Sequence, residues 1–326
     1  MEFRTKVPVK KLDFALSHSD RMVVIGSCFA ENIGKRLKES GFKASVNPFG
    51  VVFNPVSVYQ SLRRLMEGRR FEQNELFEHQ GLFHSFSHHS SFSGENAQTT
   101  LNQMNQAFDA ASDHLKETNR LMITFGTAWL YTLVSNNQVV ANCHKVPASD
   151  FNRSRLSVEE IVTDFKHLFS MLFQQNPALK ILLTVSPIRH LKDGIHENTL
   201  SKSILHLAVE QLCSFDSRIV YFPSYELMMD DLRDYRFYAD DYMHPTDMAQ
   251  QYIWEHFCSS CMDHTTIEKV KQIRQIHRAM AHRPFKSETE EYRRFIIRNI
   301  AEIDALKATF PDLDLSDEKR FFEQKL

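Results

Sequence analysis

The sequence of 326 residues has a net charge of −2, which excludes the strongly basic surface typical of nucleic-acid-binding proteins. No apolar run approaches the ~20 residues that a membrane-spanning helix needs, and the N-terminal stretch lacks the apolar centre of a signal peptide. The five cysteines are odd in number and unevenly spaced, so they do not suggest a disulfide framework. We therefore expect a cytoplasmic protein with no nucleic-acid partner and no membrane span.

Short apolar runs alternate with helical patterns along most of the chain. Apolar runs of this kind predict buried strands, and their alternation with helices indicates a parallel sheet covered by helices on both faces. The expected fold is therefore α/β with three layers, α/β/α. The predicted strands are residues 21–26, 42–46, 121–125, 178–185 and 218–222. The predicted helices are residues 28–40, 56–66, 102–116, 157–174, 198–215 and 246–261.

Other stretches depart from this alternation. Residues 71–95 alternate Phe with polar residues and predict a hairpin insert, and residues 131–143 predict a second hairpin. Toward the C-terminus the pattern is helical and charged, with apolar stripes that suggest packing. We therefore expect a main domain at residues 1–262 and a helical extension at residues 263–326.

The insert carries four histidines, which are His79, His84, His88 and His89. A zinc site needs ligands that converge at fixed spacings, usually with help from Cys or carboxylate groups, and this segment does not supply them. We therefore expect no metal and no cofactor. Alternating Phe and His residues suggest a partly exposed strand pair, which can place His89 in the wall of a substrate cleft.

Ser27 follows the first predicted strand, in the stretch VVIGSCFAENIG. The carboxyl ends of parallel strands share one rim of the sheet, where such folds bind ligands, and that rim holds Ser27. Two roles are open to it: a nucleophile, or the N-cap of the helix that follows. Cys28 is the other candidate nucleophile, but its position inside the helix start suggests packing.

A second polar group, Asp241-Tyr-Met-His244, precedes the last predicted helix of the main domain. A Ser hydroxyl is a weak nucleophile until a base takes its proton, and a carboxylate can hold that base in the correct orientation. The spacing therefore favours His244 as the base and Asp241 as its partner. The alternative is a solvated acidic pair, Asp240 and Asp241.

The stretch IGSCFA resembles the signature of the GSCFA domain family, which in turn resembles the SGNH, or GDSL-like, hydrolases. Further similar stretches are NPFGVVFNP, TFGTAWLY, ANCHKVP, TVSPIRHLKDG and DDYMHPTDMA. The resemblance implies a five-stranded, flavodoxin-like parallel sheet. It also implies that Ser27 is the nucleophile, His244 the base and Asp241 its partner. An oxyanion hole would then include the amides of Ser27 and Gly50.

One position departs from the pattern of that superfamily. The block after the third strand usually reads G-x-N-D, and here it reads Gly126-Thr-Ala128-Trp. The oxyanion hole then lacks a side-chain donor, whose loss costs about 3 kcal/mol of transition-state stabilisation. Asn142, which follows the second predicted hairpin, is the predicted replacement.

Residues near the same rim are predicted to contact the substrate. Thr127 follows the third strand, His144 follows the second hairpin, and Arg189 and His190 follow the fourth strand. Arg189 and His190 suit an anionic or polyhydroxylated substrate. The alternative for Arg189 is a salt bridge to Asp193.

Together these features favour a serine esterase or O-acyltransferase that acts on a small or carbohydrate O-acyl ester. The carbohydrate substrate is implied by the superfamily resemblance alone, because a fold does not determine a substrate. The alternative is a non-catalytic protein that binds a glycan or nucleotide on the same scaffold, with Ser27 as an N-cap.

Overall fold

Five parallel strands form the central sheet of the computed structural model, which describes residues 5–284, 286, 288–311 and 313–326. The strands lie in the order β10-β9-β5-β1-β2, which is the flavodoxin-like order. Their bounds are β1 Arg21–Gly26, β2 Lys43–Val46, β5 Arg120–Phe125, β9 Lys180–Val185 and β10 Ile219–Tyr221. The predicted fold class is confirmed, and every one of its five strands lies where the apolar runs placed it.

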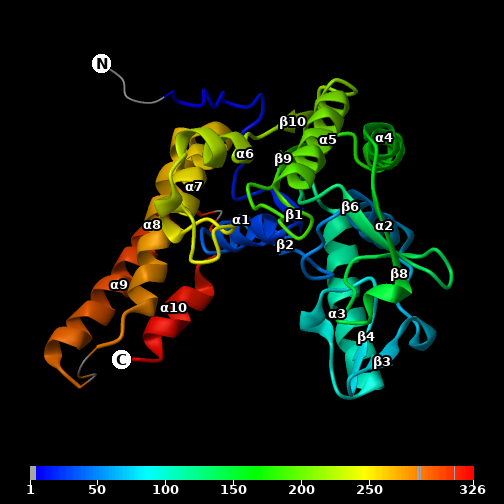
Figure 1. Ribbon diagram of the computed structural model, residues 1–326. Helices are drawn as coiled ribbons and strands as arrows, with labels where there is room; N and C mark the ends of the chain where they lie inside the picture. The colour runs from blue at the N-terminus through cyan, green and yellow to red at the C-terminus, as the bar shows by residue number, and fades with distance from the viewer. Residues whose placement is uncertain (1–4, 285, 287, 312) are drawn as a thin grey trace.

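Side chains alternate between the two faces of this sheet, so each face has an apolar core of its own. Val23 and Ile25 of β1 pack on one face, and Met22 and Val24 pack on the other. The first face is covered by α2 Pro55–Glu67, α3 Ala97–Lys116, α4 Val158–Gln175 and α5 Ile195–Cys213 (Figure 1). The second face is covered by α1 Cys28–Lys38 and α7 Asp247–Cys261. α3 begins earlier than predicted because Asn96 caps it.

Two small antiparallel sheets lie outside the central sheet. β3 Phe77–His79 pairs with β4 Leu82–His84, and β6 Trp129–Leu133 lies between β7 Val139–Val140 and β8 Phe151–Arg155. β8 was not predicted, because its sequence FNRSR holds a single apolar residue and shows no apolar alternation.

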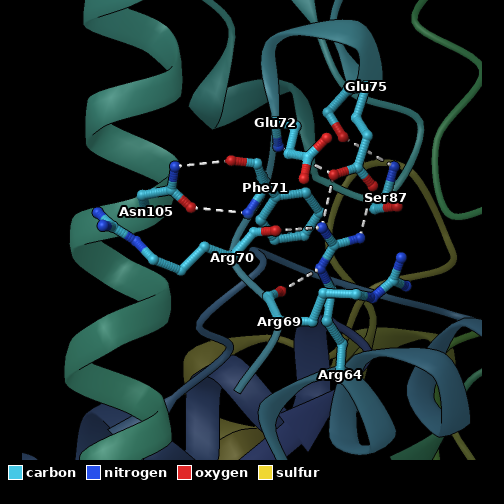
Figure 2. Close-up of polar contacts among 9 residues, drawn as sticks. Arg64, Arg69, Arg70, Phe71, Glu72, Glu75, Ser87 and Asn105 are labelled. Atoms are coloured by element: carbon cyan, nitrogen blue, oxygen red, sulfur yellow. Dashed lines mark hydrogen bonds and ion pairs between the residues drawn. The ribbon is translucent and has the colours of Figure 1, made fainter. Parts of the chain in front are cut away.

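A largely buried ion pair ties the start of the insert to α2 (Figure 2). Arg64 of α2 donates to both carboxylate oxygens of Glu75 at 2.6 Å and to two backbone carbonyl oxygens of the turn after α2 at 2.8 Å. Its guanidinium group lies 3.5 Å from the centre of the Phe71 ring. Asn105 of α3 bonds both the N–H and the carbonyl oxygen of Phe71. The insert therefore begins as part of the core.

The C-terminal helices have an apolar cluster of their own. α8 His264–Ala281, α9 Glu290–Thr309 and α10 Ser316–Glu323 lie at the end of the molecule away from β3 and β4 (Figure 1). Ile276 and Ile303 are among the residues buried in this cluster. In the described part of the chain, no helix has the length and apolar character needed to cross a membrane.

Gly26 ends β1 with a φ of 137°, and a Cβ at this position would lie 2.1 Å from the carbonyl oxygen of Thr124 on β5. We predict that Gly26→Ala lowers the free energy of unfolding by about 3 kcal/mol or more, through the clash and the unfavourable φ. The matched control is Gly81→Ala. Gly81 has a φ of 76° but no atom within 4 Å of a Cβ, so this change is expected to cost about 1 kcal/mol. If urea unfolding shows that the two substitutions lower the free energy of unfolding equally, the close approach of β1 to β5 is contradicted.

Candidate active site

Ser27 lies at the carboxyl end of β1, in the turn that leads into α1. Its Oγ accepts a hydrogen bond from the N–H of Phe29 at 3.3 Å, so Ser27 is the N-cap of α1. The residue is only 1% exposed, yet it lines a cleft of about 560 Å³. Gly126 at the end of β5 leaves room beside it, because a Cβ on Gly126 would lie 3.3 Å from the Ser27 Cβ. The hydroxyl therefore caps a helix and also lies in the floor of a cleft.

A tight turn before α7 joins Asp241 to His244. One carboxylate oxygen of Asp241 accepts from the N–H groups of Met243 and His244 at 2.9 Å each, and the other lies 2.5 Å from His244 Nδ1. Tyr242 closes the turn in the left-handed conformation, with a φ of 57°. The two backbone N–H groups, together with the His244 ring, lower the pKa of Asp241 to about 2. Asp241 is therefore a carboxylate at neutral pH.

Ser27 and His244 line the same cleft. Asp241 occupies Nδ1 of the His244 ring, and Nε2 has no hydrogen-bond partner in the described part of the chain. Among the described residues, no hydrogen bond joins Ser27 Oγ to His244. The structure thus brings the hydroxyl, the imidazole and the carboxylate to one rim of the sheet, with the first two not yet bonded to each other.

Four other residues predicted for the site also line this cleft. They are Thr127, Asn142, Arg189 and His190. They come from the loops that follow β5, β7 and β9, so the shared rim of the sheet explains their convergence.

Gly50, His89 and His144 are not among the described residues that line the cleft, contrary to expectation. The N–H of Gly50 donates to the carbonyl oxygen of Asn47 at 2.7 Å, and His89 packs against the Cα of Gly50. His144 is buried, with Nε2 2.8 Å from the carbonyl oxygen of Ser85. Residues of the insert therefore cover Gly50 and bond His144, and His89 itself belongs to the insert.

The remaining predicted oxyanion donors differ in their availability. The N–H of Ser27 already donates to the carbonyl oxygen of Thr124 at 3.2 Å. Asn142 accepts the N–H of His144 through Oδ1 at 2.9 Å, and its Nδ2 has no partner among the described residues. Of these two predicted donors, only the side-chain NH₂ group of Asn142 is therefore free of a hydrogen-bond partner within the described residues.

Sequence reasoning missed a second amide of this kind. Asn54 caps α2 by accepting the N–H of Ser57 through Oδ1 at 2.8 Å, and it also lines the cleft. Its Nδ2 has no partner within the described ranges. The Asn-Pro pair at the start of α2 predicts the cap, but nothing in the local sequence indicates that Asn54 lines the same cleft as Ser27.

His190 lies beside Ser27 with an unpaired ring nitrogen. Its Nε2 is 3.4 Å from the position of a Cβ on Gly126, and the Ser27 Cβ is 3.3 Å from that same position. Although this Nε2 is buried, it has no hydrogen-bond partner among the described residues. Burial, and then the positive charges nearby, lower the pKa of His190 to about 3, so the ring is neutral at neutral pH.

A fully buried lysine lies under the cleft. Lys202 of α5 donates through Nζ to the carbonyl oxygens of Gly126 and Ser186 at 2.7 Å each, which joins the loop after β5 to the loop after β9. In the described part of the chain no carboxylate pairs with it, and burial lowers its pKa to about 7. Ser201 Oγ accepts the N–H of Ala128 at 2.8 Å. The sequence signal for Lys202 is its place on the apolar stripe of the predicted helix.

Cys28 also lines the cleft, next to Ser27. Burial raises the pKa of its thiol, and a thiol that stays protonated is a poor nucleophile. Within the described residues, no group of three or more His, Cys, Asp or Glu side chains is placed to hold a metal ion.

Comparison with models of protein families shows which family the chain belongs to. The model of the GSCFA family matches residues 21–257. The chain belongs to the GSCFA family. A second model, described as the C-terminal domain of GSCFA domain proteins, matches residues 273–326. The resemblance expected from the IGSCFA stretch is thus confirmed.

Comparison with solved structures finds a distant likeness. This GSCFA protein is similar to an acetyl xylan esterase from the rumen bacterium Butyrivibrio proteoclasticus, with 11% identity and a TM-score of 0.32. The match covers 80% of this chain and 65% of the esterase chain, so it spans less than two thirds of that protein. A superposition this loose supports no conclusion about activity. No curated protein matches the sequence.

We predict that Lys202→Met reduces the rise of stability with pH. Lys202 has a pKa of about 7 in the folded protein, against ~10.4 in an unfolded chain, so the unfolded chain binds more protons between these values. Stability therefore rises above pH 7, by up to about 1.4 kcal/mol per pH unit, and this contribution is absent from the variant. Urea unfolding at several pH values between neutral and mildly alkaline measures the slope.

The control for this prediction is Lys38→Met, which removes an exposed lysine of α1 and should keep the wild-type slope. If Lys202→Met also keeps that slope, the buried ammonium group is not titrating as its surroundings require.

Proposed function

We propose that this GSCFA protein transfers the acyl group of an O-acyl ester, to water or to a second alcohol, with Ser27 as the nucleophile. One observation carries the proposal: Ser27 and His244 share a cleft, and Asp241 is bonded to the Nδ1 of His244. A hydroxyl, an imidazole and an ionised carboxylate at one rim supply the groups that acyl transfer needs. A carbohydrate ester is the substrate that the superfamily resemblance suggests.

The proposed reaction begins when His244 Nε2 removes the proton of Ser27 Oγ as that oxygen bonds to the ester carbonyl carbon. Asp241 accepts the Nδ1–H and stabilises the imidazolium that forms. The tetrahedral intermediate then breaks its bond to the alcohol oxygen, which takes the proton from His244. Water or another alcohol, deprotonated by His244, then attacks the acyl–Ser27 carbonyl; the bond to Ser27 Oγ breaks, Oγ takes the proton back from His244, and the acid or a new ester is released.

The first step requires that Ser27 Oγ and His244 Nε2 come within hydrogen-bond distance. Ser27 Oγ holds the N–H of Phe29 through a bond of 3.3 Å, which is long for a hydrogen bond to oxygen. Catalytic hydrogen bonds are often long or absent until the substrate binds. A hydroxyl can accept the N–H of Phe29 and donate its own hydrogen at the same time, so the cap bond does not prevent a hydrogen bond from Ser27 to His244.

A neutral His190 is proposed as the side-chain donor that replaces the missing Asn at position 128. With its hydrogen on Nε2, the ring donates without adding a charge, and the nitrogen lies beside the Ser27 side chain. The low pKa keeps the ring neutral throughout the working pH range. Asn54 and Asn142 line the same cleft and offer further donors.

Binding without catalysis is the second candidate function. The observation that favours it is that Ser27 Oγ serves as a helix cap and is not bonded to His244 among the described residues. In that case the cleft would hold a glycan or nucleotide and leave it unchanged. Covalent labelling of Ser27 separates the two candidates.

We predict that a fluorophosphonate probe forms a covalent bond with Ser27, because the probe reacts with serine hydroxyls that have an adjacent base. His244→Ala should slow labelling at least about 100-fold, since the base is lost. Mass spectrometry identifies the labelled residue, and the time course gives the rate.

Two controls accompany the labelling. His167→Ala removes an exposed histidine of α4 and should label at the wild-type rate. Cys28→Ala tests the thiol alternative, and a loss of labelled protein in this variant alone would assign the nucleophile to Cys28. The binding function is supported if no residue is labelled in the wild-type protein.

We predict that His190→Ala lowers kcat on a 4-nitrophenyl acyl ester by about 100- to 1000-fold and leaves KM within about threefold, because an oxyanion donor acts in the transition state. His190→Gln, which keeps a donor, should recover part of the loss. Steady-state kinetics measures both variants. If Asn142→Ala lowers kcat and His190→Ala does not, the donor is Asn142.

A further inference from the structure

The Arg and Lys residues that line the cleft are not matched by acidic residues. Three of its lining residues are cationic at neutral pH, and no Asp or Glu is among the described residues that line it. The three are Arg153, Arg189 and Lys192. A cleft lined by one sign of charge concentrates ligands of the opposite sign.

Arg153 does not contribute a free charge. It forms an ion pair with Asp193, and its guanidinium group lies over the rings of Trp129 and Tyr131 at 4.6 and 5.0 Å from their centres. Arg155 lies 5.4 Å from the centre of the Trp129 ring as well. Two arginines therefore lie near these aromatic rings, and each is paired with a carboxylate, Arg153 with Asp193 and Arg155 with Glu197.

Arg189 and Lys192 have no carboxylate partner among the residues that the structure describes. Arg189 contacts the sulfur of Met229 at 3.5 Å and lies 5.5 Å from the centre of the Tyr238 ring. Lys192 donates to the hydroxyl of Tyr131 at 2.6 Å. The salt bridge to Asp193 that was the alternative for Arg189 is made by Arg153 instead.

The buried amine of Lys202 lies under the same loops, and because its pKa is about 7 it carries a positive charge in only part of the molecules at neutral pH. Asp193 is paired with Arg153, and the carboxylate of Asp241 beside the cleft offsets one positive charge at most, so the combined charge of Arg189 and Lys192 exceeds it. Arg189 is half-buried, so its charge is partly removed from water without a paired carboxylate, whereas Lys192 is exposed and stays solvated. The cleft is thus short of negative charge.

We infer that the cleft binds esters that carry a negative charge, a carboxylate or a phosphate, on the part of the molecule that lies against Arg189 and Lys192. That the ligand is an ester depends on the proposed function, whereas the preference for a negative charge depends only on the residues that line the cleft. The inference therefore selects the anionic class from the anionic and polyhydroxylated classes that the sequence left open.

Binding of stable probes tests this without any catalytic step. The carboxylate pair is N-(4-nitrophenyl)succinamic acid and its uncharged equivalent N-(4-nitrophenyl)butanamide, and the phosphate pair is glucose 6-phosphate and glucose. We expect at least one anionic probe to bind the wild-type protein tenfold or more tightly than its neutral partner in calorimetric titrations. The pair that shows the difference identifies whether the charge is a carboxylate or a phosphate.

Two further measurements connect the preference to the named cations. Substituting both residues, Arg189→Gln with Lys192→Gln, should reduce the preference to threefold or less, while Lys38→Gln on α1 should keep it. In the wild-type protein, raising the salt from about 0.05 to 0.5 M should weaken only the anionic probe, because screening shortens the range of the field.

The outcomes separate this inference from the proposed function. Equal binding of charged and neutral probes in both pairs overturns the charge preference, even if Ser27 is labelled by a fluorophosphonate. A charge preference that survives the double substitution overturns the assignment to Arg189 and Lys192. A charge preference without labelling of Ser27 supports the anion site and rejects the esterase.

Discussion

The close approach of Gly26 to the backbone of β5 is the constraint on which the site depends. β1 and β5 pair in parallel up to Gly26 and Thr124, and the carbonyl oxygen of Thr124 lies where a side chain of residue 26 would begin. Ser27 therefore leaves the sheet directly beside Gly126, which also lacks a side chain. The position of the hydroxyl is thus set by two backbones in contact, and α1 is aligned by the same junction, because Ser27 caps it.

α5 provides the second level of support. Its polar side chains bond backbone groups of the loops at the rim: Asn198 holds the N–H of His190, Ser201 holds the N–H of Ala128, and Lys202 joins Gly126 to Ser186. These residues lie on the face of a helix that otherwise packs into the apolar core. The loops after β5 and β9 are therefore held to one another through α5. Because the loops are held, the distances between the side chains that they place in the cleft, including His190, are fixed as well.

Local sequence patterns predicted the positions of site residues that depend on a few neighbouring residues. They did not predict positions that depend on contacts between residues far apart in the sequence. The apolar run before Ser27 and the spacing of Asp241 and His244 were sufficient for their placement, because a strand end and a tight turn are local. The expectation that the amide of Gly50 serves the site did not take into account that this N–H bonds Asn47 and that the insert, which is folded by contacts with α2 and α3, covers Gly50. The role of Lys202 was not predicted, because a buried lysine between two loops depends on the packing of α5.

The turn that joins Asp241 to His244 has a consequence for how the site is assembled. Both groups are bonded within four residues of the chain, and the turn packs at the start of α7 rather than inside the sheet. The relative geometry of the imidazole and its carboxylate is therefore set by bonds within the turn and not by contacts with the sheet. In the proposed reaction, the geometry between the imidazole and its carboxylate is set within the turn, whereas their distance from Ser27 depends on where the turn is held.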